Sequence, residues 1–431
     1  MFKQKKLLLL PIFFLSMSIE AKEISLDMLI DLAINNNSNI KISKYKQEIK
    51  AASLDIAQAG YYPKVSLTGE VAQYDIDSGL SQVNDTVKGL SLSANQLLYD
   101  FGKTSKSIES AEENFSASKE ETIANISSTV LEIKRAYYNI LKAQQQISLY
   151  EEMILIDKLR LEQVQAYHEA GIRTLIDVTD ARLQLSNSKL KLLESKYSFK
   201  ESLANIISII GVDAKQSYEI KKDSNIIEIA SHVDEMNVQL ERLKESGLKN
   251  RPEIKLYEKQ IDAQQYQLQS IRSEYYPSVE LDAMYSNKDS DKIASLNTKQ
   301  ISAGVYLKWN VYTGNTTEAN IKNNFATLST LKQELFQQKL EIKKSIDIAY
   351  SQVKSSEESI KISFLTVELA AQKLDLAKQR YKAGISDSVE LSDATLEYSE
   401  SKNNLIDNYY NYLDAKAQLE YSIGEVKYLN L

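Results

Sequence analysis

The stretch ISSTVLE-IKRAYYN-ILKAQQQ-ISLYEEM-ILIDKLR-L, residues 126–161, repeats an apolar residue at every seventh position. The repeated residues are Ile126, Ile133, Ile140, Ile147, Ile154 and Leu161. A sustained seven-residue period keeps one side of a helix against a partner helix and winds the pair into a left-handed supercoil. Small residues beside this row, Ala136 and Ala143, permit close approach of the partner. The stretch therefore predicts a long helix that packs along its whole length.

The same stretch lies inside a much longer segment that contains no helix breaker. Glycine and proline are both absent from residues 103–170 and again from 315–383. At ~1.5 Å per residue each segment can form a helix of about 100 Å, whereas helices of globular proteins average about a dozen residues. These are not the helices of a compact domain. The alternative to a larger assembly is an antiparallel coiled coil folded on itself.

The chain carries the same unit twice, because Gly171 and Gly384, and likewise Gly211 and Gly424, are both 213 residues apart. The apolar row also returns at this offset. We expect a first repeat at 22–211 with a helix, a β-hairpin at 64–100, a long helix at 103–170, a tip turn and a helix at 175–210. The second repeat, at 235–431, has a helix, a hairpin at 277–312, a long helix at 315–383, a tip turn and a helix at 388–423. A linker at 212–234, with a short helix of its own, joins them.

The N-terminus has the pattern of a secretory signal peptide, which we place at residues 1–21. A cationic start, MFKQKK, precedes an apolar run from Leu7 to Leu15 and a small residue at Ala21. A buried N-terminal strand or helix is the alternative. No later stretch approaches the ~20 apolar residues of a membrane-spanning helix.

Composition argues against several classes of function. The net charge is −7, and removal of the signal, with three lysines and one glutamate, changes it to −9. Such a chain does not suit nucleic acid, whose phosphates need a cationic surface. There is no cysteine, and there are only two histidines, His168 and His232. We expect no metal, no cofactor and no enzymatic activity.

Each repeat also contains a segment in which apolar and polar residues alternate. Val65, Leu67 and Val71 alternate with polar residues after the Tyr-Tyr-Pro motif at 61–63, and the pattern returns after a second such motif at 275–277. Polar loops are expected at 76–87 and 287–298. Alternation over 9–11 residues suits a transmembrane barrel strand, although it also describes a half-buried soluble hairpin.

We favour the membrane, because the thin helices offer no broad core for an apolar sheet face. Tyrosines also gather where strands and helices meet, like an interfacial aromatic belt. Four strands cannot close a barrel, since known single-chain barrels begin at about eight. Open sheet edges are not tolerated in lipid, so several chains would have to supply strands together.

Several motifs occur in a fixed order along both repeats. They are NRPEI at 250–254, the two Tyr-Tyr-Pro motifs, LYDFG at 98–102, VYTG at 311–314, and the paired turns AGIRTLIDVTDA at 170–181 and YKAGISDSVELSDA at 381–394. In this order and spacing the chain resembles the TolC family of outer-membrane efflux proteins over nearly its whole mature length.

The resemblance implies a mainly α-helical fold with β-hairpins, in which a homotrimer forms an α-barrel and shares a 12-stranded transmembrane β-barrel in outer-membrane lipid. It implies a passive exit duct for efflux or type I secretion, in the outer membrane of a Gram-negative bacterium and extending into the periplasm. The implied partners are a periplasmic adaptor (membrane fusion) protein and an inner-membrane pump or ABC transporter. A soluble periplasmic coiled-coil adaptor or scaffold is the alternative, and the chain has no room for the small β-domains that an adaptor needs.

The two tip turns carry acidic residues with different expected roles. Thr174 and Asp387 are placed as helix N-caps, with Asp177 and Glu390 three residues on, which is the spacing of a capping box. Asp180 and Asp393 lie a full turn further in, where capping cannot account for them. The resemblance implies that Glu390 and Asp393 form rings of negative charge at a narrow pore entrance, and such rings favour cations. We include Asp177 and Asp180 in this acidic gate.

The resemblance also implies that Tyr381 and Asp177 hold the tip closed. The basic residue expected two positions after Gly384 is Ser386, while Arg173 occupies the matching place in the first repeat. We therefore expect a differently wired gate network of Tyr381, Arg173, Ser386 and His168, in which His168 packs at the tip and binds no metal. The adaptor-docking residues implied at the turns are Gly171, Ile172, Gly384 and Ile385.

Overall fold

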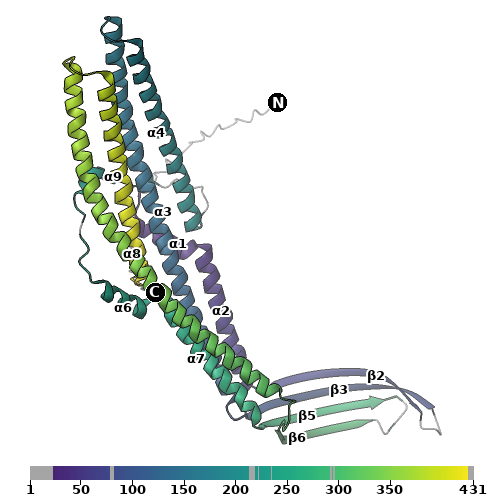
Figure 1. Cartoon of the computed structure of the whole chain (residues 1–431). Coiled ribbons are helices and arrows are strands. Elements are labelled where there is room, and N and C mark those ends of the chain that lie inside the picture. The colour runs from purple at the N-terminus through teal and green to yellow at the C-terminus, as the bar shows by residue number, and fades with distance from the viewer. Residues whose placement is uncertain are drawn as a thin grey trace, which may run out of the picture.

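A computed structural model describes residues 23–77, 82–212, 219–221, 223–233, 235–291, 294 and 297–425. The fold is mainly helical with β-hairpins, as predicted, and a four-stranded antiparallel sheet extends from one end of the long helices (Figure 1). The predicted signal peptide at 1–21 lies outside the described residues. Within those residues, no helix combines the length and the apolar character needed to cross a bilayer.

Two helices of 67 residues each give the molecule its length, α3 at Lys103–Glu169 and α8 at Thr316–Lys382. Each turns back at the end farthest from the sheet into a shorter helix, α4 at Leu175–Ile210 and α9 at Ser388–Ser422 (Figure 1). The buried residues of the long helices include Ile126, Ile133 and Ile140 in α3 and Ile346, Val353 and Ile360 in α8. The row of α8 and the first half of the row of α3 therefore lie in the seams along which these helices pack, whereas Ile147, Ile154 and Leu161 are only half-buried.

The first part of each repeat contains two helices rather than the single one expected. They are α1 at Leu26–Asn36 and α2 at Ser38–Gln58 in the first repeat, and α6 at Leu240–Asn250 and α7 at Pro252–Arg272 in the second. The break at Asn37 has a local cause: its side-chain oxygen accepts hydrogen bonds from the N–H groups of Asn39 (2.8 Å) and Ile40 (3.1 Å), which caps a new helix. In the second repeat Pro252 takes the first helical position.

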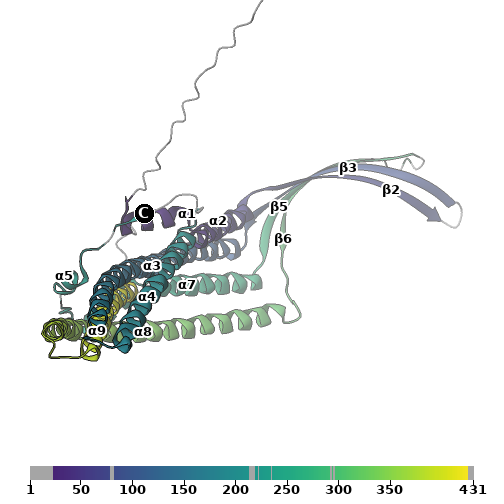
Figure 2. The ribbon, with the colours of Figure 1, turned by 90° about the horizontal axis from the view of Figure 1, so that it is seen from above.

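The long helices form a layer one helix thick, and Figure 2 shows it from above. Toward the tips, α4 packs on α3, α3 on α9, and α9 on α8. Toward the sheet, α2 packs on α3, α3 on α7, and α7 on α8. One edge of the layer is therefore made by α4 and α2, and the other by α8 along its whole length.

The sheet joins the hairpins of the two repeats. Its strands are β2 at Lys64–Asp77, β3 at Gln82–Tyr99, β5 at Ser278–Ser290 and β6 at Thr298–Lys308, paired in the order β2-β3-β5-β6. Much of the segment 76–87, expected as a loop, belongs to β2 and β3, because backbone pairing continues through polar residues. The second hairpin ends at Lys308, before the expected 312.

The strand register separates an apolar face of the sheet from a polar one. Val65, Ala94, Ala283 and Ala303 form one cross-strand row, and Leu67, Leu92, Tyr285 and Ile301 form the next. The opposite face carries hydrogen bonds between side chains, including those from the Asn95 amide to Asp282 (2.5 Å) and Glu280 (3.2 Å). In the single chain the apolar face is uncovered: Leu67 is 67% exposed and Val71 77% exposed.

The linker between the repeats crosses three helices and is fastened to each. A short strand, β4 at Glu219–Ile220, pairs in parallel with β1 at Glu23–Ile24, and a short helix follows, α5 at Ile226–Ala230. The Gln145 amide of α3 donates to the Ser224 carbonyl (2.8 Å), and the Tyr410 hydroxyl of α9 donates to Asp223 (2.9 Å).

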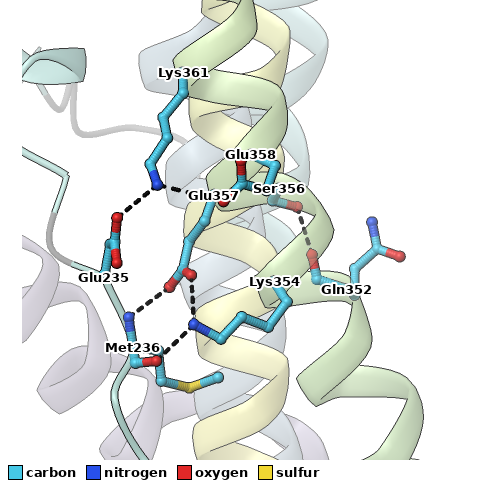
Figure 3. A network of polar contacts seen from close by, with 8 residues as sticks. All are labelled: Glu235, Met236, Gln352, Lys354, Ser356, Glu357, Glu358 and Lys361. Atoms are coloured by element: carbon cyan, nitrogen blue, oxygen red, sulfur yellow. Dashed lines mark hydrogen bonds and ion pairs between the residues drawn. The ribbon is translucent and has the colours of Figure 1, made fainter.

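On α8 the chain is held two residues after the predicted linker, at the backbone of Met236 (Figure 3). Its N–H donates to Glu357 Oε1 (2.8 Å), and its carbonyl accepts from Lys354 Nζ (2.6 Å). Lys354 also pairs with the buried Glu357 carboxylate at 2.9 Å. The linker therefore ties α3, α9 and α8 together through groups that do not depend on the Met236 side chain.

We expect Glu357→Ala to weaken the attachment of Met236 to α8, because the Met236 N–H would lose its acceptor and Lys354 would lose one of its two acceptors. The free energy of local opening at Met236 should fall by about 1–3 kcal/mol, measured by amide hydrogen exchange. The matched control is Glu358→Ala, since Glu358 is exposed and reaches only Lys361 at 3.3 Å. Equal protection of Met236 in both variants would show that the Glu357 contact contributes nothing.

Candidate functional site

The two turns at the tips are built alike. Gly171 and Gly384 end the long helices with left-handed backbone, at φ 74° and 73°. The Ile172 N–H donates back to the Tyr167 carbonyl (2.9 Å), and the Ile385 N–H donates to the Arg380 carbonyl (3.0 Å). These are Schellman turns, which glycine adopts without steric cost. Ile172 and Ile385, expected at the docking surface, are both exposed at the turns.

The helices that leave the turns have different caps. Thr174 and Asp177 form the predicted capping box, with the Thr174 N–H 2.9 Å from Asp177 Oδ2 and the Asp177 N–H 3.4 Å from Thr174 Oγ1. Asp387 accepts from the Glu390 N–H at 2.9 Å, but Glu390 does not return the bond. Its carboxylate lies 3.2 Å from Arg380 Nε, since a guanidinium is the stronger partner. The capping box predicted for Glu390 is wrong.

Arg173 links the turn of the first repeat to that of the second. Its Nη2 donates to the Ser386 carbonyl (3.0 Å), and its guanidinium lies 4.6 Å from the centre of the Tyr381 ring. Tyr381 is 2% exposed, and burial raises the pKa of its hydroxyl. Three residues of the predicted gate network therefore lie together, with the cation supplied by the first repeat.

Asp177 makes a second link between the repeats. Its Oδ1 accepts from the hydroxyl of Ser388 (2.5 Å), the first residue of α9. This bond, followed by those from Thr174 and the charge of Arg173, holds the pKa of Asp177 below its ordinary 3.8, although partial burial opposes the shift. The Asp177 carboxylate is therefore charged at neutral pH and joins α4 to α9.

His168 lies at the first turn and is exposed. Its Nδ1 donates to the Arg173 carbonyl (2.9 Å), which fixes the protonated nitrogen of the ring. Through this carbonyl His168 supports the backbone of Arg173. No cluster of three or more histidine or acidic residues suited to a metal ion occurs in the described ranges.

Asp180 and Asp393 differ from the other acidic residues of the turns. Neither forms a hydrogen bond or ion pair with another described residue, and Asp393 is exposed. Glu390, by contrast, is paired with Arg380. Among the described residues, Asp393 is therefore the carboxylate of the second turn that has neither a hydrogen bond nor an ion pair, although its charge acts on Lys373.

Three further residues belong to this junction and were not predicted from the sequence: Ser388, Arg160 and Asp157. Arg160 of α3 is 5% exposed and donates from Nη2 to the Ser388 carbonyl (2.8 Å). Asp157 is also buried and accepts from the Ser188 hydroxyl of α4 (2.5 Å). Asp157 stands two heptads after Ala143, in a row of small and apolar residues. A charged residue at such a position was the sequence signal that could have indicated a role for Asp157 and for Arg160 beside it.

Comparison with known proteins places these features in a family. A family model described as outer membrane efflux protein matches residues 29–212 and again 243–425, one match in each repeat. The outer membrane efflux protein BepC of Brucella suis biovar 1 is 21% identical over 367 residues, which cover 84% of this chain and 77% of that protein.

Two further matches span nearly the whole chain. The toluene efflux pump outer membrane protein TtgC of Pseudomonas putida is 20% identical over 424 residues, covering 93% of this chain and 83% of that protein. Among solved structures, CusC, studied for folding and transmembrane channel formation, superposes with a TM-score of 0.82. It is 16% identical and covers 94% of this chain and 93% of that one, so this likeness concerns the fold.

We expect the link through Asp177 to fail only in acid. Because the folded pKa lies below 3.8, its stabilisation is complete above that value and disappears as pH falls through the lowered folded pKa. Spin labels on cysteines introduced at Ile172 and Ile385 of this cysteine-free chain would report the distance between the turns. Asp177→Asn should broaden that distance at pH 6, as acid does in the unmodified protein.

The matched control for this experiment is Asp393→Asn, which removes the same charge from a residue that forms no hydrogen bond or ion pair with another described residue. It should leave the distance between the turns unchanged at pH 6. Broadening in both variants, or in neither, would contradict a specific role for the Asp177–Ser388 bond.

Proposed function

The chain belongs to the outer membrane efflux protein family, and on that premise we propose that three copies of it form one continuous exit duct. Membership of the family makes the chain a transport protein of the outer membrane that extends into the periplasm, and not an enzyme. The number of copies, the closed duct and its partners are the proposal.

One observation carries this proposal: the helical layer and the sheet both end at the same two edges, where, within the described part of the chain, the edge helices and edge strands lack a neighbour on one side. On one side, among the described residues, the edge is made by α4, then α2, then β2, which pairs only with β3. On the other side it is made by α8 throughout and then by β6, which pairs only with β5. Each edge is therefore continuous from tip to sheet.

Both helical edges expose apolar side chains at close to heptad spacing. On the first edge these are Ile176, Leu183, Leu190, Leu193 and Tyr197 of α4, and Ile42, Tyr45, Ile49 and Ile56 of α2. On the second edge they are Phe325, Phe336, Leu340, Ile348, Ile362, Leu365, Leu369 and Leu376 of α8. Rows of this length are unfavourable in water and mark a surface that a partner covers. Packing α8 against α4 and α2 of the next copy would bury both rows.

The two edges are different surfaces, so they can join only head to tail, and head-to-tail contacts that close give a ring. Two copies would contribute eight strands, and the interior of a barrel of about eight strands is just filled by side chains. Three copies would contribute twelve strands and leave a lumen. Three is therefore the smallest ring that can conduct, and it agrees with the resemblance of the sequence.

In such a ring the apolar sheet face would lie against lipid and the polar face would line the lumen. From Val65 to Val71 the apolar face spans about 20 Å at ~3.3 Å per residue, close to the ~25 Å apolar band of outer-membrane barrels. Exposed tyrosines at the junction with the helices, Tyr61, Tyr62, Tyr275, Tyr276 and Tyr312, would form the belt at the membrane surface.

The tips would form the inner entrance of the duct. The contacts of Arg173 with Ser386 and Tyr381, supported by His168, and those of Asp177 would hold it closed. Asp393, Asp180 and Glu390, repeated around the axis, would supply its negative charge. The turns at Gly171 and Gly384 would meet a periplasmic adaptor coupled to an inner-membrane pump or ABC transporter, for efflux or type I secretion.

Leu190→Glu should prevent ring formation, because it would bury a charge in the contact between copies. Native mass spectrometry in detergent should then show single chains instead of trimers. The matched control is Gln184→Glu, which adds the same charge to the same helix away from the exposed row. A single chain in the unmodified protein, or a trimer in Leu190→Glu, would contradict the proposed ring.

Neutralising Asp393 should weaken the cation preference of the channel more than neutralising Glu390, because Arg380 already compensates the charge of Glu390. Reversal potentials of Asp393→Asn and Glu390→Gln in planar bilayers, under a salt gradient, would measure the preference. If the double variant kept the selectivity of the unmodified channel, these carboxylates would not face the pore.

A further inference from the structure

We propose that Arg160 is a positioning residue that fixes where α9 lies against α3 at the entrance, at a cost in stability. The inference rests on the proposed function, since it assigns control of the entrance to one buried side chain. Arg160 lies outside the turn, 11 residues before Gly171. It therefore acts on the bodies of the helices and not on the turn itself.

The start of α9 is held at three points by the first repeat. Arg173 donates to the Ser386 carbonyl (3.0 Å), and Asp177 accepts from the Ser388 hydroxyl (2.5 Å). Arg160 adds the third contact, at the carbonyl of Ser388 (2.8 Å). The first two come from the turn and from the start of α4, whereas the third comes from α3. Of these three contacts, only that of Arg160 connects the start of α9 directly to α3.

The surroundings of Arg160 show that stability alone does not account for it. Its Nε and Nη1 have no hydrogen-bond partner among the described residues, and neither do Asp157 Oδ1 and the Tyr381 hydroxyl. All of these atoms are buried. Burial lowers the pKa of Arg160, although the nearby Asp157, Tyr381, Asp180 and Asp177 oppose the shift. A buried charge with unsatisfied donors is unfavourable compared with an apolar side chain of similar size.

What the polar contact supplies is a defined position. Apolar seams allow helices to shift or rotate, because one apolar contact can replace another. A hydrogen bond from a buried guanidinium to one particular carbonyl exists in a single arrangement, as a lone polar residue in a coiled-coil core fixes register. Separation of α9 from α3 would break this bond and admit water to Arg160, Asp157 and Tyr381. Arg160 therefore fixes the position of α9 against α3 in the closed entrance, but it does not stabilise that closed state strongly.

The test compares Arg160→Met with Arg135→Met in the full chain. Arg135 is the matched control, because it also joins α3 to α9, through Asp414 (2.8 Å) and Gln418 (2.8 Å), but lies far from the tips. Three quantities are measured: single-channel conductance, the unfolding temperature, and the distance between spin labels at exposed Leu159 of α3 and Leu396 of α9.

Arg160→Met should raise conductance at least twofold and broaden the label distance, while the unfolding temperature stays the same or rises. Arg135→Met should change neither conductance nor distance. Arg160→Lys, which keeps the charge with a single donor group, should lie between Arg160→Met and the unmodified protein.

Unchanged conductance and distance in Arg160→Met, or equal changes in Arg135→Met, would overturn the proposal. Loss of folding in Arg160→Met would also overturn it, because a guanidinium that lowers stability cannot be required for the fold. If the unmodified protein formed no channel, the proposed function would fail, and the label distance would still decide the role of Arg160.

Discussion

The structure depends on one constraint: apolar seams run along helices that form a layer only one helix thick. Each helix buries one row against its neighbour on either side, and the residues between these rows face solvent. Because, among the described residues, only the short helices α1, α5 and α6 and the linker lie over this layer, the last helix on each side keeps an uncovered apolar row, on α4 and α2 at one edge and on α8 at the other. The proposed ring would complete the interaction that joins helices within the chain and that is left incomplete at both edges.

The sequence predicted what is local and periodic. Helix lengths followed from the absence of glycine and proline, and packing rows followed from the seven-residue period, because both depend on residues close together in the chain. The split at Asn37 was not predicted, although its cause is local and an asparagine in front of Ser38 was its signal. The extension of the strands through 76–87 was not predicted from the alternation of apolar and polar residues, since backbone pairing does not depend on whether side chains are polar.

The side-chain contacts at the two tip turns could not be predicted from local and periodic patterns. The turns, the caps and the acidic residues could be located, but not their partners. Glu390 was expected to cap its own helix and instead pairs with Arg380, and Arg160 reaches a carbonyl 228 residues away. Contacts of this kind depend on how the repeats lie against each other, which neither repeat encodes alone. The repeats also differ at this place, as Arg173 and Ser386 show, so the duplication does not transfer contacts from one half to the other.

The sheet has a consequence for biogenesis. Its outer strands, β2 and β6, have unpaired backbone groups along one side, and one of its faces is apolar and bare. Edges of this kind recruit any other strand within reach, including the wrong one. If the chain assembles as the proposed ring, a newly exported chain would be most prone to aggregation before its neighbours arrive. Its escape from aggregation would then depend on how fast the chains meet, or on a holding factor that covers the hairpins until they do.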